Sequence, residues 1–479
     1  MDCTAIVSQQ RAFFYTGTTL SYAYRIQALK QLDNALTHHQ ADILAALHAD
    51  LRKSDTEGYM TEIGVLKADL RYAMRHLRRW MRPQKAKTEL MLFPASCYRK
   101  PEPYGVVLIM APWNYPLLLC LEPLVGALAA GNCAVIKPSA YAPATSHVVA
   151  EIISECFPPA YCTVVEGGRA ENVGLLREAF DYIFFTGSTT VGKQVLAAAA
   201  EHVTPVSLEL GGKSPVIIDA SASLDLAAKR IVFGKFINAG QTCVAPDYVM
   251  VPTALKEPLV ARLQYWISRF YPQAEAGTEA GAEVQAEQVP GGIADYPRIV
   301  NEKHFDRLLG LMNAEVTRAP QGGDDAVLGG RYDRASLTIQ PTLLPQASAQ
   351  SPVMQEEIFG PLLPILTYER MDQVIAFIRE RPKPLALYLF AEDKHVQQHV
   401  IQSLSFGGGC INDTLLHVGT SQLPFGGVGY SGMGSYHGKQ SFITFTHFKS
   451  IVNKGTRLDP GLRYRPYGRH FLPLLKRFL

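Results

Sequence analysis

The sequence predicts an α/β protein built on a parallel sheet that helices cover on both faces. From residue 105 onward, short apolar runs without polar alternation are separated by stretches of helical length. Strands buried on both faces have this continuous apolar pattern, and intervening helices are the usual connections of a parallel sheet. A chain of 479 residues also exceeds what one core usually supports, so we expect two or three subdomains around a shared site.

The elements are predicted in order along the chain. Residues 22–80 form a helical entry segment, because Ala, Leu, Arg and Glu predominate there and Gly and Pro are scarce. Strands are expected at residues 105–110, 134–137, 162–166 and 182–185, and helices between them at residues 116–130, 144–156 and 173–179. A second α/β series, with a helix at residues 227–236, is expected from Val206 to about Ile411. Parallel sheets bind ligands where strand C-termini meet helix N-termini, so the chemistry should lie where the two series join.

The composition excludes several classes of function. With 47% hydrophobic residues, 19% charged residues and a formal net charge of +3, the chain lacks the basic character of a nucleic-acid-binding protein. Residues 1–10 contain no signal-like pattern, and no segment approaches the roughly 18 apolar residues of a membrane span. The eight cysteines are scattered without zinc-like spacing. We therefore expect a cytoplasmic protein with reduced thiols and no metal site.

Two segments differ in composition from the rest. Residues 272–292 are rich in Ala, Glu, Gln and Gly without an apolar face, which is typical of a solvated surface loop. Residues 462–479 interleave Arg and Lys with Phe and Leu, and they are too few and too charged to span a bilayer. Such a tail suits either the surface of an anionic membrane or packing on a dimer.

A Gly/Ser/Thr turn follows the strand predicted at residues 182–185. The backbone N–H groups that open the next helix suit a phosphate. The spacing from Gly187 to Lys193 matches a P-loop, but Gln194 stands where that motif needs a Ser or Thr for magnesium. A nucleotide-phosphate site without triphosphate hydrolysis fits the pattern, and so does a turn whose glycines serve backbone geometry alone.

Three polar side chains are candidates for catalysis. Cys243 lies between a Gly-containing turn and small residues, which makes it the best nucleophile candidate among the cysteines. Glu209 ends an apolar run, where a carboxyl group tends to hold its proton and can act as a base near neutral pH. Asn114 follows the first strand and can donate to a developing oxyanion. A helix cap or ion-pair partner at Glu209, and a turn stabiliser at Asn114, remain alternatives.

Seven stretches, taken together and in order, resemble motifs of the aldehyde dehydrogenase superfamily. They are APWNYP at residue 111, IKPS at 136, FTGS at 185, LELGGKSP at 208, GQTCVAPDYV at 240, EEIFGP at 356 and PFGGVGYSGMGSYHGK at 424. The resemblance extends from about residue 22 to residue 452. The Thr242–Cys243 pair and the Gly-rich C-terminal motif are similar to the class 3 branch, which includes fatty, aromatic and medium-chain aldehyde dehydrogenases.

The resemblance implies NAD(P)-dependent oxidation of an aldehyde, hydrophobic aliphatic or aromatic, to the carboxylic acid. It implies that Cys243 forms a thiohemiacetal and then a thioester, and that Glu209 activates the hydrolytic water. Asn114 and the backbone N–H of Cys243 would form the oxyanion site. The implied cofactor contacts are Lys137, Gly187, Ser188, Val191, Gly192, Glu357 and Phe359.

One departure from the family pattern bears on the cofactor. The KPS motif is followed by Ala140, where the family often has a glutamate that binds the ribose 2′-hydroxyl. A missing carboxylate removes a repulsion against a 2′-phosphate. We therefore expect both NAD and NADP to be accepted.

The resemblance also implies a domain organisation. It consists of a Rossmann-like cofactor domain (1–81 and 105–208), an α/β catalytic domain (209–411), a small β bridging element (82–104 and 412–453) and a basic, apolar tail (454–479). A homodimer is implied through the bridging element, and peripheral membrane contact is an option for the tail. The segment at residues 272–292 is expected to be a surface insertion. Tyr115, Leu118 and Leu119 are candidates for an apolar substrate site, with burial in the core as the alternative.

Three other functions compete with this interpretation. An acylating dehydrogenase would pass the thioester to coenzyme A, but such relatives usually lack the base, which Glu209 supplies here. A nucleoside triphosphatase would need the hydroxyl that is missing after Lys193. A non-catalytic protein on this fold would be free to lose Cys243, Glu209 and Asn114, and all three are present.

Overall fold

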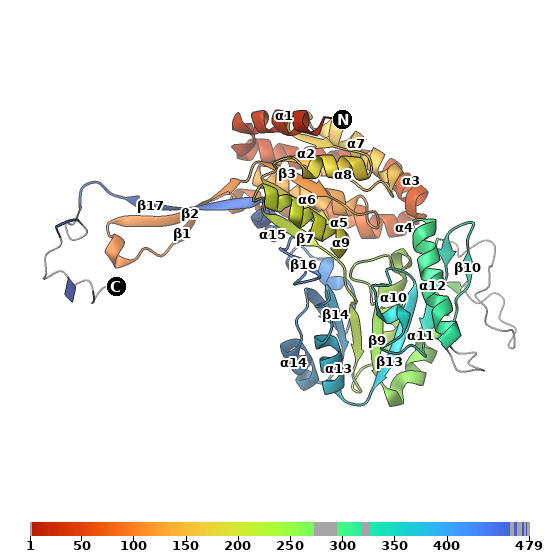
Figure 1. Cartoon of the computed structure of the whole chain (residues 1–479). Helices are drawn as coiled ribbons and strands as arrows, with labels where there is room; N and C mark the ends of the chain where they lie inside the picture. The colour runs from red at the N-terminus through yellow and green to blue at the C-terminus, as the bar shows by residue number, and fades with distance from the viewer. Residues whose placement is uncertain are drawn as a thin grey trace.

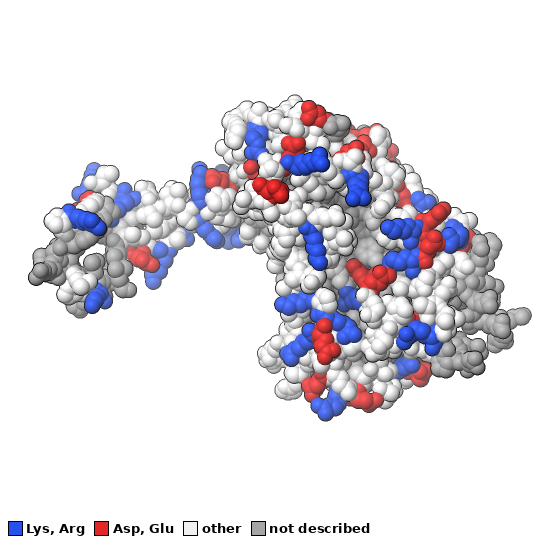
Figure 2. Space-filling model, viewed as in Figure 1, with Lys and Arg blue, Asp and Glu red and all other residues white. Residues whose placement is uncertain are grey.

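The computed structural model describes residues 2–272, 295–318 and 326–459, together with 464–466, 472, 473 and 476. Two α/β units lie next to each other, and a narrow β-arm extends from one of them (Figure 1). Basic and acidic side chains are interspersed over the face of both units in Figure 2.

The first unit is built around a six-stranded sheet in the order β16-β7-β6-β3-β4-β5. Its strands are β3 (Val106–Met110), β4 (Cys133–Lys137), β5 (Cys162–Val164), β6 (Tyr182–Thr186), β7 (Val206–Glu209) and β16 (Gly432–Met433). The first five pair in parallel, and β16 joins β7 antiparallel. Every residue of β3, β4 and β6 is buried, as their continuous apolar sequences predict.

Helices connect these strands and cover the sheet. They are α6 (Leu118–Ala130), α7 (Pro143–Cys156), α8 (Arg169–Leu176) and α9 (Thr189–Glu201). The predicted alternation of strand and helix is therefore present. The helix expected at 173–179 begins earlier, because Glu171 caps it by accepting from the N–H of Gly168 at 2.7 Å.

The predicted helical entry segment consists of several helices that pack around α6 and α7 of the first unit. They are α2 (Tyr22–His38), α3 (Gln40–Leu51), α4 (Asp55–Gly58), the π-helical turn η2 (Tyr59–Ile63) and α5 (Gly64–Trp80). A further helix, α1 (Cys3–Tyr15), precedes them and was not predicted. It buries only Val7 and Gln10, and the amide of Gln10 donates to the carbonyl of Ala134 at 2.9 Å. An apolar face this small leaves little periodicity in the sequence.

The second unit contains a parallel sheet in the order β12-β13-β9-β8-β14-β15. Its strands are β8 (Pro215–Ile218), β9 (Tyr248–Pro252), β12 (Thr342–Leu344), β13 (Leu362–Tyr368), β14 (Ala386–Phe390) and β15 (Gly408–Ile411). Its helices include α10 (Leu224–Phe236), α11 (Lys256–Phe270), α12 (Glu302–Arg318), α13 (Met371–Arg379) and α14 (Lys394–Ser403). The expectation that this series starts at Val206 was wrong, because β7 pairs with β6 in the first sheet.

The arm consists of β1 (Gln84–Ala86), β2 (Ala95–Pro103) and β17 (Thr446–Lys454), which follows α15 (Lys439–Thr444). Strands β2 and β17 pair antiparallel along their whole length and project away from both units (Figure 1). Residues 95–103 and 446–453 of the predicted bridging element therefore lie side by side, whereas residues 432–433 of its second segment form β16 in the first sheet. Its role in dimerisation and the exact division into domains stay predictions.

Two predicted segments lie largely outside the residues that the structure describes. Residues 273–292 of the expected surface loop lie outside the described residues, as does most of the tail at 462–479. The peripheral membrane contact expected of that tail therefore stays a prediction. Among the described residues, every helix is too short or too polar to span a bilayer.

Candidate active site

Cys243 lies on a loop between a distorted 3-10 turn, η4 (Ile237–Gly240), and β9. Asn238 and Ala239 have left-handed backbones with φ of 51° each, and Gly240 follows at 74°. A side chain at Gly240 would collide with the carbonyl of Gly360, so only glycine fits this close approach. The sharp turn brings Cys243 into the wall of a cavity, where its side chain is half-buried.

The environment of Cys243 disfavours the thiolate at rest. Burial raises the pKa of this thiol well above its usual value, and the carboxyl groups of Glu209 and Glu357 raise it further. All eight cysteines are free thiols, and Cys120, Cys133, Cys156 and Cys162 are buried in the core. Cys243 lines the same cavity as the carboxyl group of Glu209.

Glu209 ends β7 and lines the same cavity as Cys243. One carboxyl oxygen, Oε2, accepts from the hydroxyl of Tyr436 at 3.0 Å. The other, Oε1, is buried and has no hydrogen-bond donor among the described residues. Burial raises the pKa of this carboxyl to about 8, opposed by the bond from Tyr436. The contacts of Glu209 do not support the two alternative roles, a helix cap and an ion-pair partner. No basic side chain in the described ranges pairs with Glu209.

Asn114 follows β3 and is 2% exposed. Its amide Nδ2 donates to the carbonyl of Gln241 at 3.0 Å, two residues before Cys243. One further N–H of this amide has no acceptor within the described structure. The side chain therefore links the first sheet to the Cys243 loop, and its second amide N–H can still donate a hydrogen bond.

The cavity beside Cys243 and Glu209 has a volume of about 280 Å³ and mainly apolar walls. The apolar lining residues are Met60, Val65, Leu118, Leu119, Phe233, Ile237, Val244, Leu415, Leu416, Val418 and Phe425. The hydroxyl of Tyr115 lies 2.6 Å from that of Thr242 in the same wall. Tyr115, Leu118 and Leu119 thus line the cavity, as one of the two sequence alternatives proposed.

Glu122 and His437 were missed by the sequence reasoning. Both are at most 5% exposed and line the cavity, with His437 Nε2 placed 3.4 Å from Glu122 Oε1. Burial raises the pKa of Glu122 well above its usual value, with contributions from Asp69 and Glu209. Glu122 could have been found as an acid within the otherwise apolar stretch LLLCLEPLVGALAA.

The predicted phosphate turn begins where β6 ends. Ser188 caps α9, and its Oγ accepts from the N–H of Val191 at 3.4 Å. The N–H of Gly187 donates to the carbonyl of Glu209 at 3.0 Å, which ties the turn to β7. Gly192 packs against Leu210, where a Cβ atom would come within 2.7 Å of a methyl group. The first turn of α9 leaves backbone N–H groups without intrahelical acceptors, as a phosphate site needs.

Lys137 ends β4 at the same edge of the sheet. Its ammonium group donates to the carbonyls of Pro138 and Gly167 at 2.6 and 2.7 Å, and burial lowers its pKa. Ala140 lies three residues beyond it and is exposed. No carboxylate therefore occupies the position after the KPS motif.

Glu357 and Phe359 lie on the segment that enters β13. Burial and the charge of Asp247 raise the pKa of the Glu357 carboxyl to about 8. This carboxyl lies against Gly211 in a second cavity, of about 530 Å³, that Thr189 of α9 also lines. Phe359 packs edge-on against Trp113, with ring centroids 5.3 Å apart.

A mostly buried ion pair fixes the Glu357 segment. The Lys213 ammonium group bonds Asp247 Oδ1 at 2.5 Å and the carbonyls of Val353 and Glu356 at 2.9 Å each. The other oxygen of Asp247 accepts from the N–H of Ile358 at 3.0 Å.

The site as a whole fits a dinucleotide. It combines glycines that allow close approach, free N–H groups at α9, Lys137 and the second cavity. Within the described ranges, no three His, Cys, Asp or Glu residues are grouped as a metal site would require.

Comparisons with known proteins agree with this arrangement. The family model described as "Aldehyde dehydrogenase family" matches residues 1–451. The chain is 49% identical over 461 residues to 4,4'-diaponeurosporen-aldehyde dehydrogenase of Staphylococcus aureus, covering 96% of each chain. It is 40% identical over 460 residues to a dimeric NADP-preferring aldehyde dehydrogenase of Canis lupus familiaris, again covering 96% of each. A structure of the substrate-bound state of Staphylococcus aureus AldH superposes with a TM-score of 0.91, 46% identity and 99% coverage of both chains.

Proposed function

The chain belongs to the aldehyde dehydrogenase family, and on this basis we propose which aldehyde it takes and how its residues act. It is an enzyme that oxidises aldehydes to carboxylic acids with NAD or NADP as the oxidant. The proposed substrate is an aldehyde with a long apolar chain. The apolar cavity that adjoins Cys243 and Glu209 supports this choice.

Apolar walls favour an apolar chain because burial of apolar surface contributes about 25 cal/mol per Å². A charged or strongly hydrated substrate would lose water there and regain few hydrogen bonds. The name of the Staphylococcus aureus relative, which refers to 4,4'-diaponeurosporen-aldehyde, supports the same choice.

In the proposed mechanism, Cys243 Sγ attacks the aldehyde carbon and the carbonyl oxygen becomes an oxyanion. The thiol proton passes to solvent as the S–C bond forms, so Glu209, which lines the same cavity, remains available for the later hydrolytic step. Asn114 and the backbone N–H of Cys243 donate to the oxyanion, a contribution whose loss typically costs about 100 to 1,000-fold in rate. A nicotinamide cofactor held by Glu357 and Phe359 would supply the hydride acceptor needed to oxidise the thiohemiacetal on Cys243 to a thioester.

Hydrolysis of the thioester is assigned to Glu209. Its carboxylate takes a proton from water, the water oxygen attacks the carbonyl, and the C–S bond breaks to release Cys243 and the carboxylic acid. A buried carboxyl with a pKa of about 8 is a stronger base, once ionised, than an exposed one. Its oxygen Oε1 has no hydrogen-bond donor among the described residues and is assigned to that water.

The remaining site residues are assigned to the cofactor. Lys137 would hold the adenosine side, and the turn formed by Gly187, Ser188, Val191 and Gly192 would lie beside the phosphates and adenine. Glu357 and Phe359 would hold the nicotinamide riboside. Acceptance of both cofactors by this chain rests on Ala140.

A homodimer formed through the arm belongs to the same proposal. A ribbon of two or three strands is marginally stable alone, and β2 and β17 extend beyond the body of the chain (Figure 1). Apolar side chains such as Phe93 and Val452 are 63% and 56% exposed on the arm. A partner chain would cover them. The cytoplasmic location stays a prediction.

The test is a screen of NAD(P)H formation over straight-chain and polyunsaturated aldehydes of increasing length, with Cys243→Ala as the control. We expect kcat/KM to rise with apolar chain length and activity to vanish in the control. Activity in Cys243→Ala, or a preference for short polar aldehydes, would contradict the proposal.

A further inference from the structure

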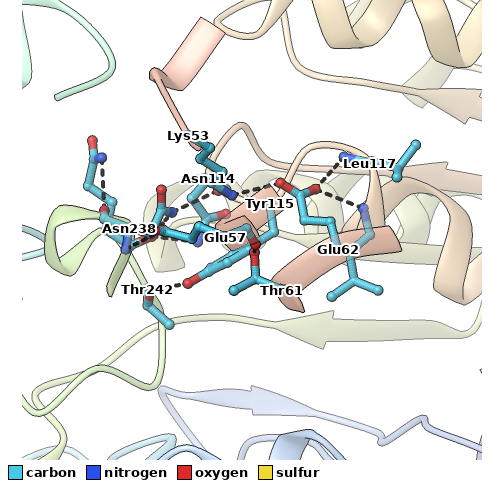
Figure 3. A network of polar contacts seen from close by, with 11 residues as sticks. Lys53, Glu57, Thr61, Glu62, Asn114, Tyr115, Leu117, Asn238 and Thr242 are labelled. Carbon is cyan, nitrogen blue, oxygen red and sulfur yellow. Dashed lines mark hydrogen bonds and ion pairs between the residues drawn. The ribbon is translucent and has the colours of Figure 1, made fainter. Parts of the chain in front are cut away.

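A buried ion pair lies next to the proposed oxyanion donor (Figure 3). Lys53 Nζ lies 2.6 Å from Glu62 Oε1, and both side chains are 0% exposed. Neither residue lines the cavity beside Cys243. Their position nevertheless connects them to the catalytic groups through Asn114.

The local sequence explains why Lys53 points inward. Helix α3 ends at Leu51, and the left-handed backbone of Arg52 (φ 59°) reverses the chain. Ser54 then caps α4, with its Oγ accepting from the N–H of Glu57 at 3.3 Å. Between these two signals Lys53 is turned into the protein, toward Glu62 on η2.

The pair holds the turn that carries Asn114 from both ends. Lys53 donates to the backbone carbonyl of Asn114 at 3.0 Å and lies 4.1 Å from the ring centroid of Tyr115. Glu62 Oε2 accepts from the N–H groups of Leu117 and Leu118 at 2.9 and 3.1 Å, at the start of α6. The turn is thus held on both sides of Pro116, by Lys53 before it and by Glu62 after it.

A second set of contacts ties this turn to the Cys243 loop. Asn238 Nδ2 donates to the same carbonyl of Asn114 at 2.8 Å and to the carbonyl of Gln241 at 3.1 Å. Asn238 is itself held by Glu57, which accepts from its N–H at 2.8 Å. A shift of Asn114 would therefore change its distance from the Cys243 loop.

We propose that Lys53 and Glu62 are positioning residues that hold the Asn114 amide where it donates to the oxyanion formed on Cys243. The inference rests on the proposed function, which assigns that donor role to Asn114. Stability alone does not explain the pair, because apolar residues of similar volume often stabilise a core as well as a buried ion pair does. A displacement of about 1 Å at such a donor can cost about 100-fold in rate.

The test is a double-mutant cycle between the pair and Asn114. The variant K53M/E62Q removes both charges of the pair together, and the amide oxygen introduced by E62Q can still accept from the start of α6. We expect kcat/KM for the aldehyde to fall about 10 to 100-fold, while KM for NAD stays within about twofold. In an N114A background the same pair of changes should alter kcat/KM by less than about threefold, because the donor it positions is gone.

The control is K67M/D33N, which neutralises another mostly buried lysine pair, at 3.0 Å, that makes no contact with Asn114. It should lower the melting temperature and leave kcat/KM unchanged. If K53M/E62Q does not fold, K53R enters the same cycle, since it retains the charge and changes the donor geometry. Equal effects of the pair with and without Asn114 would overturn the inference. An unchanged kcat/KM in N114A alone would instead refute the proposed role of Asn114.

Discussion

The hydroxyl of Tyr436 donates to Glu209 Oε2 at 3.0 Å, in the wall of the cavity that Cys243 also lines. The two residues are 227 positions apart, and the antiparallel pairing of β16 with β7 brings them together. The bond favours the ionised carboxylate and opposes the effect of burial, which raises the pKa of Glu209 to about 8. One oxygen of the Glu209 carboxyl therefore accepts from Tyr436, which lowers its pKa, and the other has no donor among the described residues.

Replacement of Glu209 by Gln should separate the two halves of the reaction. The amide cannot take a proton from water, so the thioester should form and persist. We expect a burst of NAD(P)H of about one equivalent per site, followed by turnover reduced by about 100-fold or more. Stopped-flow absorbance at the NAD(P)H band measures both phases.

The matched control for this change is Glu315→Gln. Glu315 is another buried carboxyl, with Oε2 bonded to Ser351 at 2.9 Å, remote from the cavity. It should keep normal steady-state turnover. Slow NAD(P)H release without a burst in Glu209→Gln would show that Glu209 acts before the thioester and not on it.

The pH dependence of hydrolysis should report the raised pKa of Glu209. Because the base acts in its ionised form and its pKa is about 8, the hydrolysis rate should rise about tenfold per pH unit below that value and level off above it. Tyr436→Phe removes the bond that favours the carboxylate. The midpoint should therefore move to higher pH, and the rate at pH near 7 should fall.

Tyr182→Phe is the control for the tyrosine change. It removes a buried hydroxyl that lies 2.7 Å from Ser207 of β7, without touching Glu209. Its pH profile should superpose on that of the unchanged enzyme. A midpoint that stays in place in Tyr436→Phe would contradict the tuning of Glu209 by this bond.

The sequence predicted the parts of the fold that depend on local pattern. Strands β3, β4 and β6 were placed to within a residue, because each is a continuous apolar run buried on both faces. Helix α1 was missed because it buries only Val7 and Gln10. The pattern alone placed β7 in the second series, because four residues do not indicate which sheet they join; the domain bounds implied by the resemblance (105–208) kept most of it in the first, where it pairs with β6.

The candidate site was predictable where motifs carry it and unpredictable where distant segments meet. Cys243, Glu209 and Asn114 stand in recognisable stretches of sequence. Tyr436 could not be paired with Glu209, because their contact depends on an edge strand of two residues. Lys53 and Glu62 resemble exposed charges of a helical segment until tertiary packing buries them together.

Removal of an aromatic side chain at the rim of the apolar cavity should alter chain-length preference. Phe233 lines the cavity and is 40% exposed, so Phe233→Ala removes contact area with little effect on the core. We expect KM for long-chain aldehydes to rise about 10-fold and KM for short ones to stay unchanged, since a lost aromatic contact costs roughly 1.5 kcal/mol or more. Steady-state kinetics over a chain-length series measures this.

Phe270→Ala provides the control, because Phe270 is 37% exposed and lines neither of the two cavities described above. It should leave the chain-length series unchanged. An equal rise of KM for short and long aldehydes in Phe233→Ala would place the apolar chain elsewhere.

Introduction of a carboxylate at residue 140 should restrict the cofactor. Ala140 is exposed just beyond Lys137, where the family often has the glutamate that binds a ribose 2′-hydroxyl. In Ala140→Glu the new charge would repel a 2′-phosphate, so kcat/KM for NADP should fall about 10 to 100-fold, equivalent to about 1.4 to 2.7 kcal/mol, while that for NAD changes little. Ala140→Gln has nearly the same shape without the charge and should retain NADP activity. If the unchanged enzyme already prefers NAD by more than about a thousandfold, the open position at Ala140 does not determine cofactor choice, and the preference must come from the geometry of Lys137 and the α9 turn.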